Sequence, residues 1–256
     1  MIIQPLSCVG QIIKPVVAGC PFIRKHPRLT LVLALLLAMV LMTPAAAWLL
    51  NRMYPLPLPG TSAERFAQTI TDYRGQPLRA FADINGVWRY EIQQQQVAPF
   101  YLQALLAYED RWFYRHPGVN PLAMARAAWQ NLRCGCVVSG GSTLTMQVAR
   151  LLDPHSRSLG GKLKQLWRAA QLEWLLSKDE ILELYLNLAP MGGPVEGVEA
   201  ASRLYLNKAS ADLSLAESAL LAVLPQSPSR LRPDRYPERA QQARNKVLKR
   251  LLDFGL

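Results

Sequence analysis

One stretch of the chain limits its possible folds more than any other. Residues 29–50 form an uninterrupted run without a charged side chain. At about 1.5 Å of rise per residue, a helix of this length spans the roughly 30 Å hydrocarbon core of a bilayer. We therefore predict a transmembrane signal-anchor helix at 29–50. The alternative is a cleaved signal peptide, because small residues at 45–47 lie near the end of the apolar run.

Charge on either side of this run predicts its orientation. Lys14, Arg24, Lys25 and Arg28 precede it, whereas only Arg52 follows closely. The positive-inside rule then places residues 1–28 in the cytoplasm as a basic tail and exports the rest of the chain. A formal net charge of +11 indicates an anionic partner. Nucleic acid is not expected, because the chain is exported and carries no nucleic-acid motif.

The exported part divides by composition. Residues 51–98 contain a proline-rich stalk at 54–60 and a small β-hairpin or meander, with strands predicted at 78–82 and 87–92 around Asn85-Gly86. Residues 99–256 are predicted to form a mainly α domain, and half of the whole chain is apolar, enough for a core. Helices are expected from 99 and at 122–132, 144–152, 163–176, 178–188, 214–224 and 237–254.

The four cysteines do not suggest a metal site. Cys8 and Cys20 precede the apolar run, and Cys134 and Cys136 follow it. This distribution lacks the paired spacing of zinc ligands. Cys134 and Cys136 are expected to be either a disulfide or two free thiols.

Glu109 is the first candidate for chemistry. It ends an apolar helical pattern and lies beside the aromatic residues Tyr108, Trp112, Phe113 and Tyr114. Burial among such groups raises the pKa of a carboxyl and suits it to general acid or base catalysis. The alternative is a surface ion pair of Glu109-Asp110 with Arg111 or Arg115.

Two further segments could hold an anion or a sugar. Gly140-Gly141-Ser142-Thr143 precedes a helical run that contains Gln147, and its hydroxyls and amides could bind a ligand or simply cap the helix. Five cations follow within nineteen residues and could bind a diphosphate, face solvent or contact anionic lipid. They are Arg150, Arg157, Lys162, Lys164 and Arg168.

These motifs, in their order, resemble a known enzyme family. Glu-Asp-x-x-Phe-x-x-His-x-Gly begins at Glu109, Gly-Gly-Ser-Thr-Leu-Thr-Met-Gln follows at 140–147, and Ser-Lys-Asp-Glu-Ile-Leu-Glu-Leu-Tyr-Leu-Asn occupies 177–187. The chain from about Arg74 onward is similar to the family 51 peptidoglycan glycosyltransferases. This family includes the transglycosylase module of class A penicillin-binding proteins and the monofunctional transglycosylases.

The resemblance implies a lysozyme-like domain on the outer face of the cytoplasmic membrane. Such enzymes polymerise lipid II into glycan strands, releasing undecaprenyl diphosphate with inversion at the anomeric carbon. Glu109 would be the general base that deprotonates the GlcNAc 4-hydroxyl. Implied substrate-binding residues are Asp110, Phe113, His116, Ser142, Thr143, Gln147, Arg150, Arg157, Lys162 and Lys164.

The resemblance also suggests partners and inhibitors. A divalent cation, Mg or Mn, is often used by the family, although this chain shows no dedicated carboxylate cage and we expect no metal-binding residues. Partners would be lipid II, the growing strand, the membrane and other cell-wall synthesis proteins. Moenomycin, a phosphoglycolipid that mimics the growing strand, should compete for the cleft.

This sequence departs from the family pattern in two ways. Gly161 and Gln165 stand where many members have Arg and a second Glu in Arg-Lys-x-x-Glu. Either Glu109 carries the proton chemistry alone or activity is reduced. No Ser is followed three residues later by Lys within these 256 residues, so we expect no transpeptidase activity. Alternative functions are a lytic transglycosylase and a non-catalytic protein that binds glycan or lipid II and recruits wall-synthesis partners.

Overall fold

A computed structural model describes residues 43–58, 66–74, 77–136, 140–156 and 158–256. Its backbone contacts divide the chain into two units, 1–55 and 56–256. In the first unit, residues 43–53 are helical. Among the described residues, no helix combines the length and the apolar character needed to cross a bilayer. Most of the anchor predicted at 29–50 lies outside the described residues.

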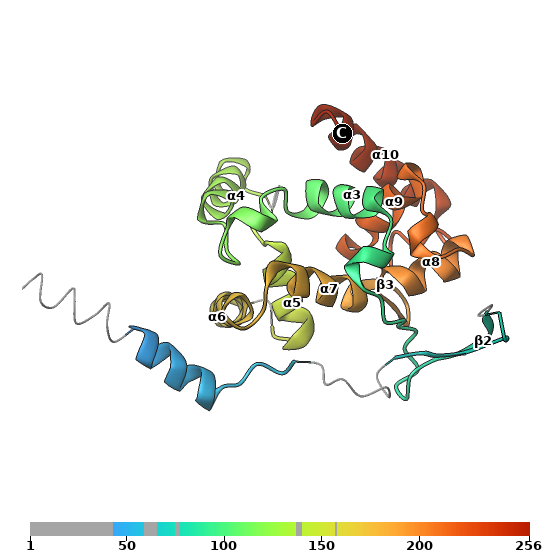
Figure 1. Ribbon diagram of the computed structural model, residues 1–256. Helices are drawn as coiled ribbons and strands as arrows, with labels where there is room; N and C mark the ends of the chain where they lie inside the picture. The colour runs from blue at the N-terminus through green and yellow to red at the C-terminus, as the bar shows by residue number, and fades with distance from the viewer. Residues whose placement is uncertain (1–42, 59–65, 75–76, 137–139, 157) are drawn as a thin grey trace, which may run out of the picture. The chain divides into compact units, whose positions relative to one another are not determined.

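The second unit is mainly helical, as the sequence predicts, and it has two small two-stranded sheets (Figure 1). The longer helices are α3 (Pro99–Glu109), α4 (Pro121–Cys134), α5 (Leu144–Leu152), α6 (Leu159–Leu175), α7 (Lys178–Leu188), α8 (Val198–Leu206), α9 (Leu215–Val223) and α10 (Pro237–Asp253). The strands are β1 (Gln68–Thr71), β2 (Pro77–Phe81), β3 (Pro190–Gly192) and β4 (Val195–Glu196). Short 3₁₀ turns are η3 (Gln94–Gln96), η4 (Phe113–Arg115), η5 (Ser210–Asp212) and η6 (Leu224–Gln226).

Two helical groups build the core. The first packs α3 against α9 and α10, and the second packs α5 against α6 and α7. In α3, Tyr101, Ala104 and Leu105 are fully buried, because their i, i+3, i+4 spacing places them on one side of the helix. α5 buries Thr145, Val148 and Ala149 with the same spacing. The last residue of α3 and the polar residues of α5 are thereby fixed to rigid elements.

The predicted second strand at 87–92 is wrong. β1 pairs antiparallel with β2, whereas Trp88 forms only an isolated bridge with Val195. The backbone N–H of Trp88 donates to Pro194 O at 2.8 Å, and Trp88 O accepts from the N–H of Glu196 at 3.0 Å. Arg89 also forms an ion pair with Glu196. The segment therefore pairs with β4, which is more than one hundred positions away and which local turn signals do not reveal.

The cysteine alternatives are also resolved by the structure. Cys134 and Cys136 form a disulfide at the end of α4. Gly135 between them has a φ of 66°, in the left-handed region that glycine adopts without steric cost. The disulfide closes the C-terminal end of this helix, where the left-handed residue already ends the helical hydrogen-bonding pattern.

Asn187 fixes the segment that precedes α3. Its Oδ1 accepts from the backbone N–H of Ile92 at 2.9 Å, and its Nδ2 donates to Ile92 O at 2.9 Å. Asn187 is buried in α7, so these two bonds satisfy polar backbone groups that have little access to water.

We predict that Asn187→Ala lowers the free energy of unfolding by about 2–4 kcal/mol, because it leaves both Ile92 groups unpaired. Urea unfolding of the full chain in detergent, followed by circular dichroism, measures this change. Gln241→Ala, on an exposed position of α10, serves as the control and should change stability by less than about 0.5 kcal/mol. Equal stabilities of the two variants would contradict the prediction.

Candidate active site

Glu109 is the last residue of α3, and its carboxylate is held by two neutral amides. Its Oε2 accepts from Gln147 Nε2 at 2.7 Å, and its Oε1 accepts from Gln226 Nε2 at 3.0 Å. Gln147 lies in α5, and Gln226 ends the turn η6. Within the described ranges Glu109 forms no ion pair. The structure therefore does not contain the alternative, a surface ion pair of Glu109 with Arg111 or Arg115.

Burial dominates the electrostatics of this carboxylate. Loss of hydration raises the pKa of Glu109 above its usual value, and this effect exceeds the opposing effects of the Gln147 and Gln226 hydrogen bonds and of the Arg250 charge. The charge of Asp110 adds a further small upward shift. A carboxyl with a raised pKa is a stronger base when ionised, which suits proton abstraction near neutral pH.

A cleft of about 520 Å³ lies beside this carboxylate. Its walls include both of the amides that bind Glu109. The polar lining residues are Ser142, Gln147, Arg150, His155, Gln165, Tyr185 and Gln226. Segments far apart in the sequence, from α5, α6, α7 and η6, therefore meet at one cavity.

Arg150 lines this cleft, and Lys162 adds a second positive charge behind it through bonds to two lining residues. Lys162 Nζ donates to Ser142 Oγ at 2.9 Å and to Gln165 Oε1 at 3.1 Å. Burial lowers the pKa of Lys162, and the nearby Arg150 guanidinium lowers it further. Neither cation has a carboxylate partner within the part of the chain that the structure describes. Two cations that repel each other in this way are suited to binding a diphosphate.

Gln165 performs two hydrogen-bonding tasks at once. Its Oε1 accepts from Lys162, and its Nε2 donates to the backbone carbonyl of Met146 at 2.6 Å. The side chain is buried, so both ends of the amide are matched to a partner. A glutamate here would place a carboxylate oxygen against the Met146 carbonyl, and it would also neutralise the charge of Lys162. Gln165 therefore fits this environment as an amide.

Other predicted site residues form a buried brace behind the cleft. Asp110 accepts from His116 Nε2, which lies 3.0 Å from both carboxylate oxygens, and from the backbone N–H of Leu144 at 2.9 Å. Thr143 caps α5 and donates its hydroxyl to Gly118 O. The structure brings Asp110, His116 and Thr143 together around the start of α5, and their predicted contact with substrate stays a prediction.

Gly118 is required beside this brace. Its φ is 77°, and a Cβ atom there would lie 2.6 Å from Glu173 Cγ. Glu173 Oε1 in turn accepts from Thr145 Oγ1 at 2.6 Å and from Lys178 Nζ at 2.7 Å. Any larger residue at 118 would push on this network and on α5.

The remaining predicted residues lie away from the cleft or outside the described part of the chain. Phe113 is buried in the core, with Lys178 Nζ 4.5 Å from its ring centroid. Lys164 pairs with Asp153 at 2.8 Å and is partly exposed. Arg157 lies outside the described residues. The sequence analysis did not predict Gln226 or Tyr185 as site residues. The only signal for Gln226 was the pair of prolines at 225 and 228, which indicate a fixed turn.

The residues of this cleft are not a usual set of metal ligands. Among the described residues, no three His, Cys, Asp or Glu side chains are grouped so that they could hold a metal ion. The polar lining of the cleft consists of Arg150, His155, amides and hydroxyls, and the use of a divalent cation stays a prediction.

Comparison with known proteins identifies the family. A family model described as a transglycosylase matches residues 74–252. The chain belongs to the transglycosylase family. The match covers all of the residues that form the cleft and the brace, from Glu109 to Gln226.

Individual relatives of this transglycosylase are penicillin-binding proteins. The chain is 61% identical over 211 residues to penicillin-binding protein 1C of Escherichia coli, which covers 82% of the chain and 27% of that protein. It is 40% identical over 190 residues to penicillin-binding protein 1A of Aquifex aeolicus, covering 74% of the chain and 26% of that protein. The motif residues at 160–169 and 224–233 predict similarity to the 1C proteins, and the comparison confirms it.

A solved structure was also matched. The chain is similar to the crystal structure of penicillin-binding protein 1A from Haemophilus influenzae, with a TM-score of 0.40 and 24% sequence identity, over 75% of this chain and 19% of that one. This transglycosylase therefore spans about a quarter of the length of the curated relatives that it matches.

We predict that Gln165→Glu weakens the binding of a diphosphate, with the Kd for pyrophosphate rising about tenfold. A carboxylate would pair with Lys162 and reduce the positive charge available to the anion, and one hydrogen bond to charge is worth about 1.5–3 kcal/mol. Calorimetric titration of the full chain in detergent with pyrophosphate measures this Kd. The exposed Gln103→Glu on α3 is the control. A Kd equal to that of the unchanged chain would contradict the prediction.

Proposed function

We propose that this transglycosylase polymerises lipid II into glycan strands, as a peptidoglycan glycosyltransferase. Glu109 removes the proton from the GlcNAc 4-hydroxyl of one substrate, and that oxygen attacks the MurNAc anomeric carbon of the other with inversion. The bond from that carbon to the diphosphate oxygen breaks, and undecaprenyl diphosphate leaves with the electron pair. The family match and its penicillin-binding relatives support this class of reaction.

The hydrogen bonding of Glu109 supports a general base. Both carboxylate oxygens accept from N–H donors, at 2.7 and 3.0 Å, and these two bonds favour the ionised form, whereas burial raises the pKa. Lytic cleavage of finished glycan would require a protonated carboxyl that donates to the leaving oxygen. A raised pKa would serve that acid as well, so the observation that carries the proposal is the pair of cations at the same cleft, Arg150 and Lys162.

The cationic wall supports the same conclusion. Negative charge gathers on the departing diphosphate in the transition state, and fixed cations nearby stabilise that charge. Arg150 and Lys162 hold no carboxylate within the described ranges, so their charge is free to act on a ligand. A site that only bound neutral glycan would have no use for two uncompensated cations.

The decisive experiment is incubation of the full chain with lipid II in detergent. We expect glycan polymer to form, and we expect Glu109→Gln to reduce its rate by about 10²–10⁴-fold, the usual contribution of a general base. Arg244→Gln, in the partly exposed surface of α10, is the control. Cleavage of purified sacculi without polymer would support the lytic alternative, and lipid II binding without turnover would support a non-catalytic binder.

The pH dependence provides a separate prediction. Because Glu109 must be ionised, activity should fall as the pH falls through its raised pKa. Gln226→Leu removes a hydrogen bond that lowers this pKa, so the acid limb of kcat should move upward by about 0.7 pH units for a bond worth about 1 kcal/mol. Rate profiles measured between pH 5 and 8 test this shift. A limb that stays in place, or moves downward, would refute the proposed role of Gln226.

Location in the cytoplasmic membrane is part of the same proposal. The uncharged run at 29–50 would cross the membrane once, with the basic tail 1–28 in the cytoplasm and the catalytic unit on the outer face. Lipid II is itself anchored in that leaflet, so an anchored enzyme and its substrate would meet within one plane. Partners among other cell-wall synthesis proteins would be reached in the same place.

A further inference from the structure

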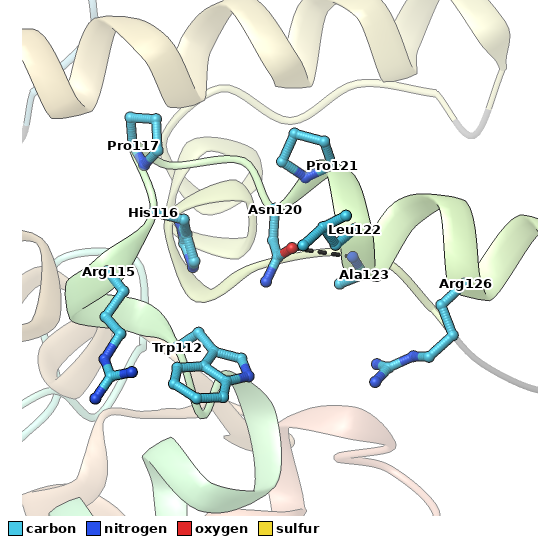
Figure 2. Close-up of a pocket in the computed structure, with 9 residues that line it drawn as sticks. All are labelled: Trp112, Arg115, His116, Pro117, Asn120, Pro121, Leu122, Ala123 and Arg126. Carbon is cyan, nitrogen blue, oxygen red and sulfur yellow. Dashed lines mark hydrogen bonds between the residues drawn. The ribbon is translucent and has the colours of Figure 1, made fainter.

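A second cavity lies outside the cleft that contains Glu109. It has a volume of about 460 Å³ and is formed by residues around the turn η4 and the start of α4 (Figure 2). We call it the Trp112 pocket. Its side chains include Trp112, Arg115, His116, Asn120, Leu122 and Arg126. None of these residues lines the cleft beside Glu109.

The Trp112 pocket is positively charged. Its lining contains two arginines and no carboxylate. Neither Arg115 nor Arg126 has a carboxylate partner in the portion of the chain that the structure covers. In Figure 2 they lie on opposite sides of the Trp112 indole. Guanidinium groups without a partner bind carboxylate and phosphate well, because their planar N–H groups match the geometry of both anions.

Two further side chains add polar groups to this pocket. Asn120 caps α4, and its Oδ1 accepts from the backbone N–H of Ala123 at 2.9 Å. The cap fixes the orientation of the amide and leaves the Nδ2 protons for another acceptor. His116 lines the pocket wall and is more than nine-tenths buried, and its Nδ1, which has no hydrogen-bond partner among the described atoms, is shielded from solvent. The N-terminal end of α4 adds partial positive charge at the same place.

Trp112 adds a partly exposed aromatic surface beside these polar groups. It is 45% exposed, and the guanidinium carbons of Arg115 and Arg111 lie 4.5 and 5.6 Å from the centroid of its indole. An exposed tryptophan is a large amphipathic surface, and it packs well against the apolar face of a ring while polar groups bind at its edge. An anionic ligand with a sugar ring would use both features.

We propose that the Trp112 pocket binds an anionic carbohydrate, with the sugar ring packed on Trp112 and its carboxylate or phosphate bound by Arg115 and Arg126. The anion site follows from the charges and does not depend on the enzyme's reaction. The choice of a carbohydrate rests on the proposed function. The substrate of that function carries a sugar joined to phosphate, and its lactyl carboxyl is joined to the peptide stem as an amide. A muramyl residue without the peptide stem carries a free lactyl carboxylate and is the second kind of acidic sugar.

Fluorine NMR of the full chain in detergent tests this binding directly. The six tryptophans are labelled with 5-fluorotryptophan, and Trp112→Phe identifies the resonance of residue 112. The probes are the GlcNAc-MurNAc disaccharide, pyrophosphate and neutral chitobiose. We expect the disaccharide, pyrophosphate or both to shift the Trp112 resonance with saturation, and chitobiose to produce no saturable shift.

Two matched variants of α4 locate the anion. Arg126→Gln should weaken the binding at least fivefold, whereas Arg133→Gln, an exposed arginine of the same helix outside the pocket, should leave it within twofold. Saturation by the disaccharide alone identifies the carboxylate as the ligand group, and saturation by pyrophosphate alone identifies the phosphate. Any of three results would overturn the proposal. Neither the disaccharide nor pyrophosphate saturates the shift, chitobiose binds as well as they do, or Arg126→Gln and Arg133→Gln have equal effects.

The same titration in Glu109→Gln separates this proposal from the proposed function. Glu109 does not line the Trp112 pocket, so the Trp112 resonance should titrate as before while polymerisation is lost. If the unchanged chain makes no polymer and yet shows the Arg126-dependent titration, the proposed polymerisation is refuted and the proposed binding in the Trp112 pocket is supported. If polymer forms and the Trp112 resonance does not titrate, the pocket is refuted alone.

Discussion

The carboxylate of Asp110 is the interaction on which the rest of the site depends. It accepts from the imidazole of His116 and from the backbone N–H of Leu144, and it is buried. A negative charge at the start of a helix is favoured by the helix dipole and satisfies an N–H that has no partner within the helix. One side chain thus joins the end of α3 to the beginning of α5. Glu109 and Gln147 come from those two elements, so the length of their hydrogen bond depends on this junction.

Both of the functional charges in the cleft are held by neutral amides. Gln147 and Gln226 orient the carboxylate of Glu109, and Gln165 orients the ammonium of Lys162. An arginine beside Glu109 would lower its pKa and weaken it as a base, and a glutamate beside Lys162 would cancel its charge. An amide fixes the position of a charge without neutralising it. This explains how the carboxylate of Glu109 and the ammonium of Lys162 can lie beside one small cleft without pairing with each other.

Sequence patterns predicted seven of the eight longer helices, because periodicity is local, and they missed α8. The ranges 144–152 and 178–188 coincide with α5 and α7, and Ser177 and Glu180 form a reciprocal cap at the start of α7. Pairing of Trp88 with β4 was not predictable, since it depends on contact between distant segments. Glu109 was predicted from its aromatic surroundings together with the family resemblance, and its catalytic role stays a prediction. Gln226 was missed, because a glutamine in a proline-flanked turn carries no local sign that its partner is a carboxylate 117 positions earlier.

That separation has a consequence for how the chain acquires its reactivity. A contact across 117 positions forms only after the intervening helices have folded, since closing so long a loop is costly until other contacts compensate. The carboxylate of Glu109, at the end of α3, accepts its second hydrogen bond only when η6, which precedes the C-terminal helix, has packed in its native position. A partly folded chain that lacks this contact would therefore hold an incompletely oriented carboxylate. Orientation of the Glu109 side chain and completion of folding are thus coupled in time, and a chain arrested before Gln226 would lack one of the two amides.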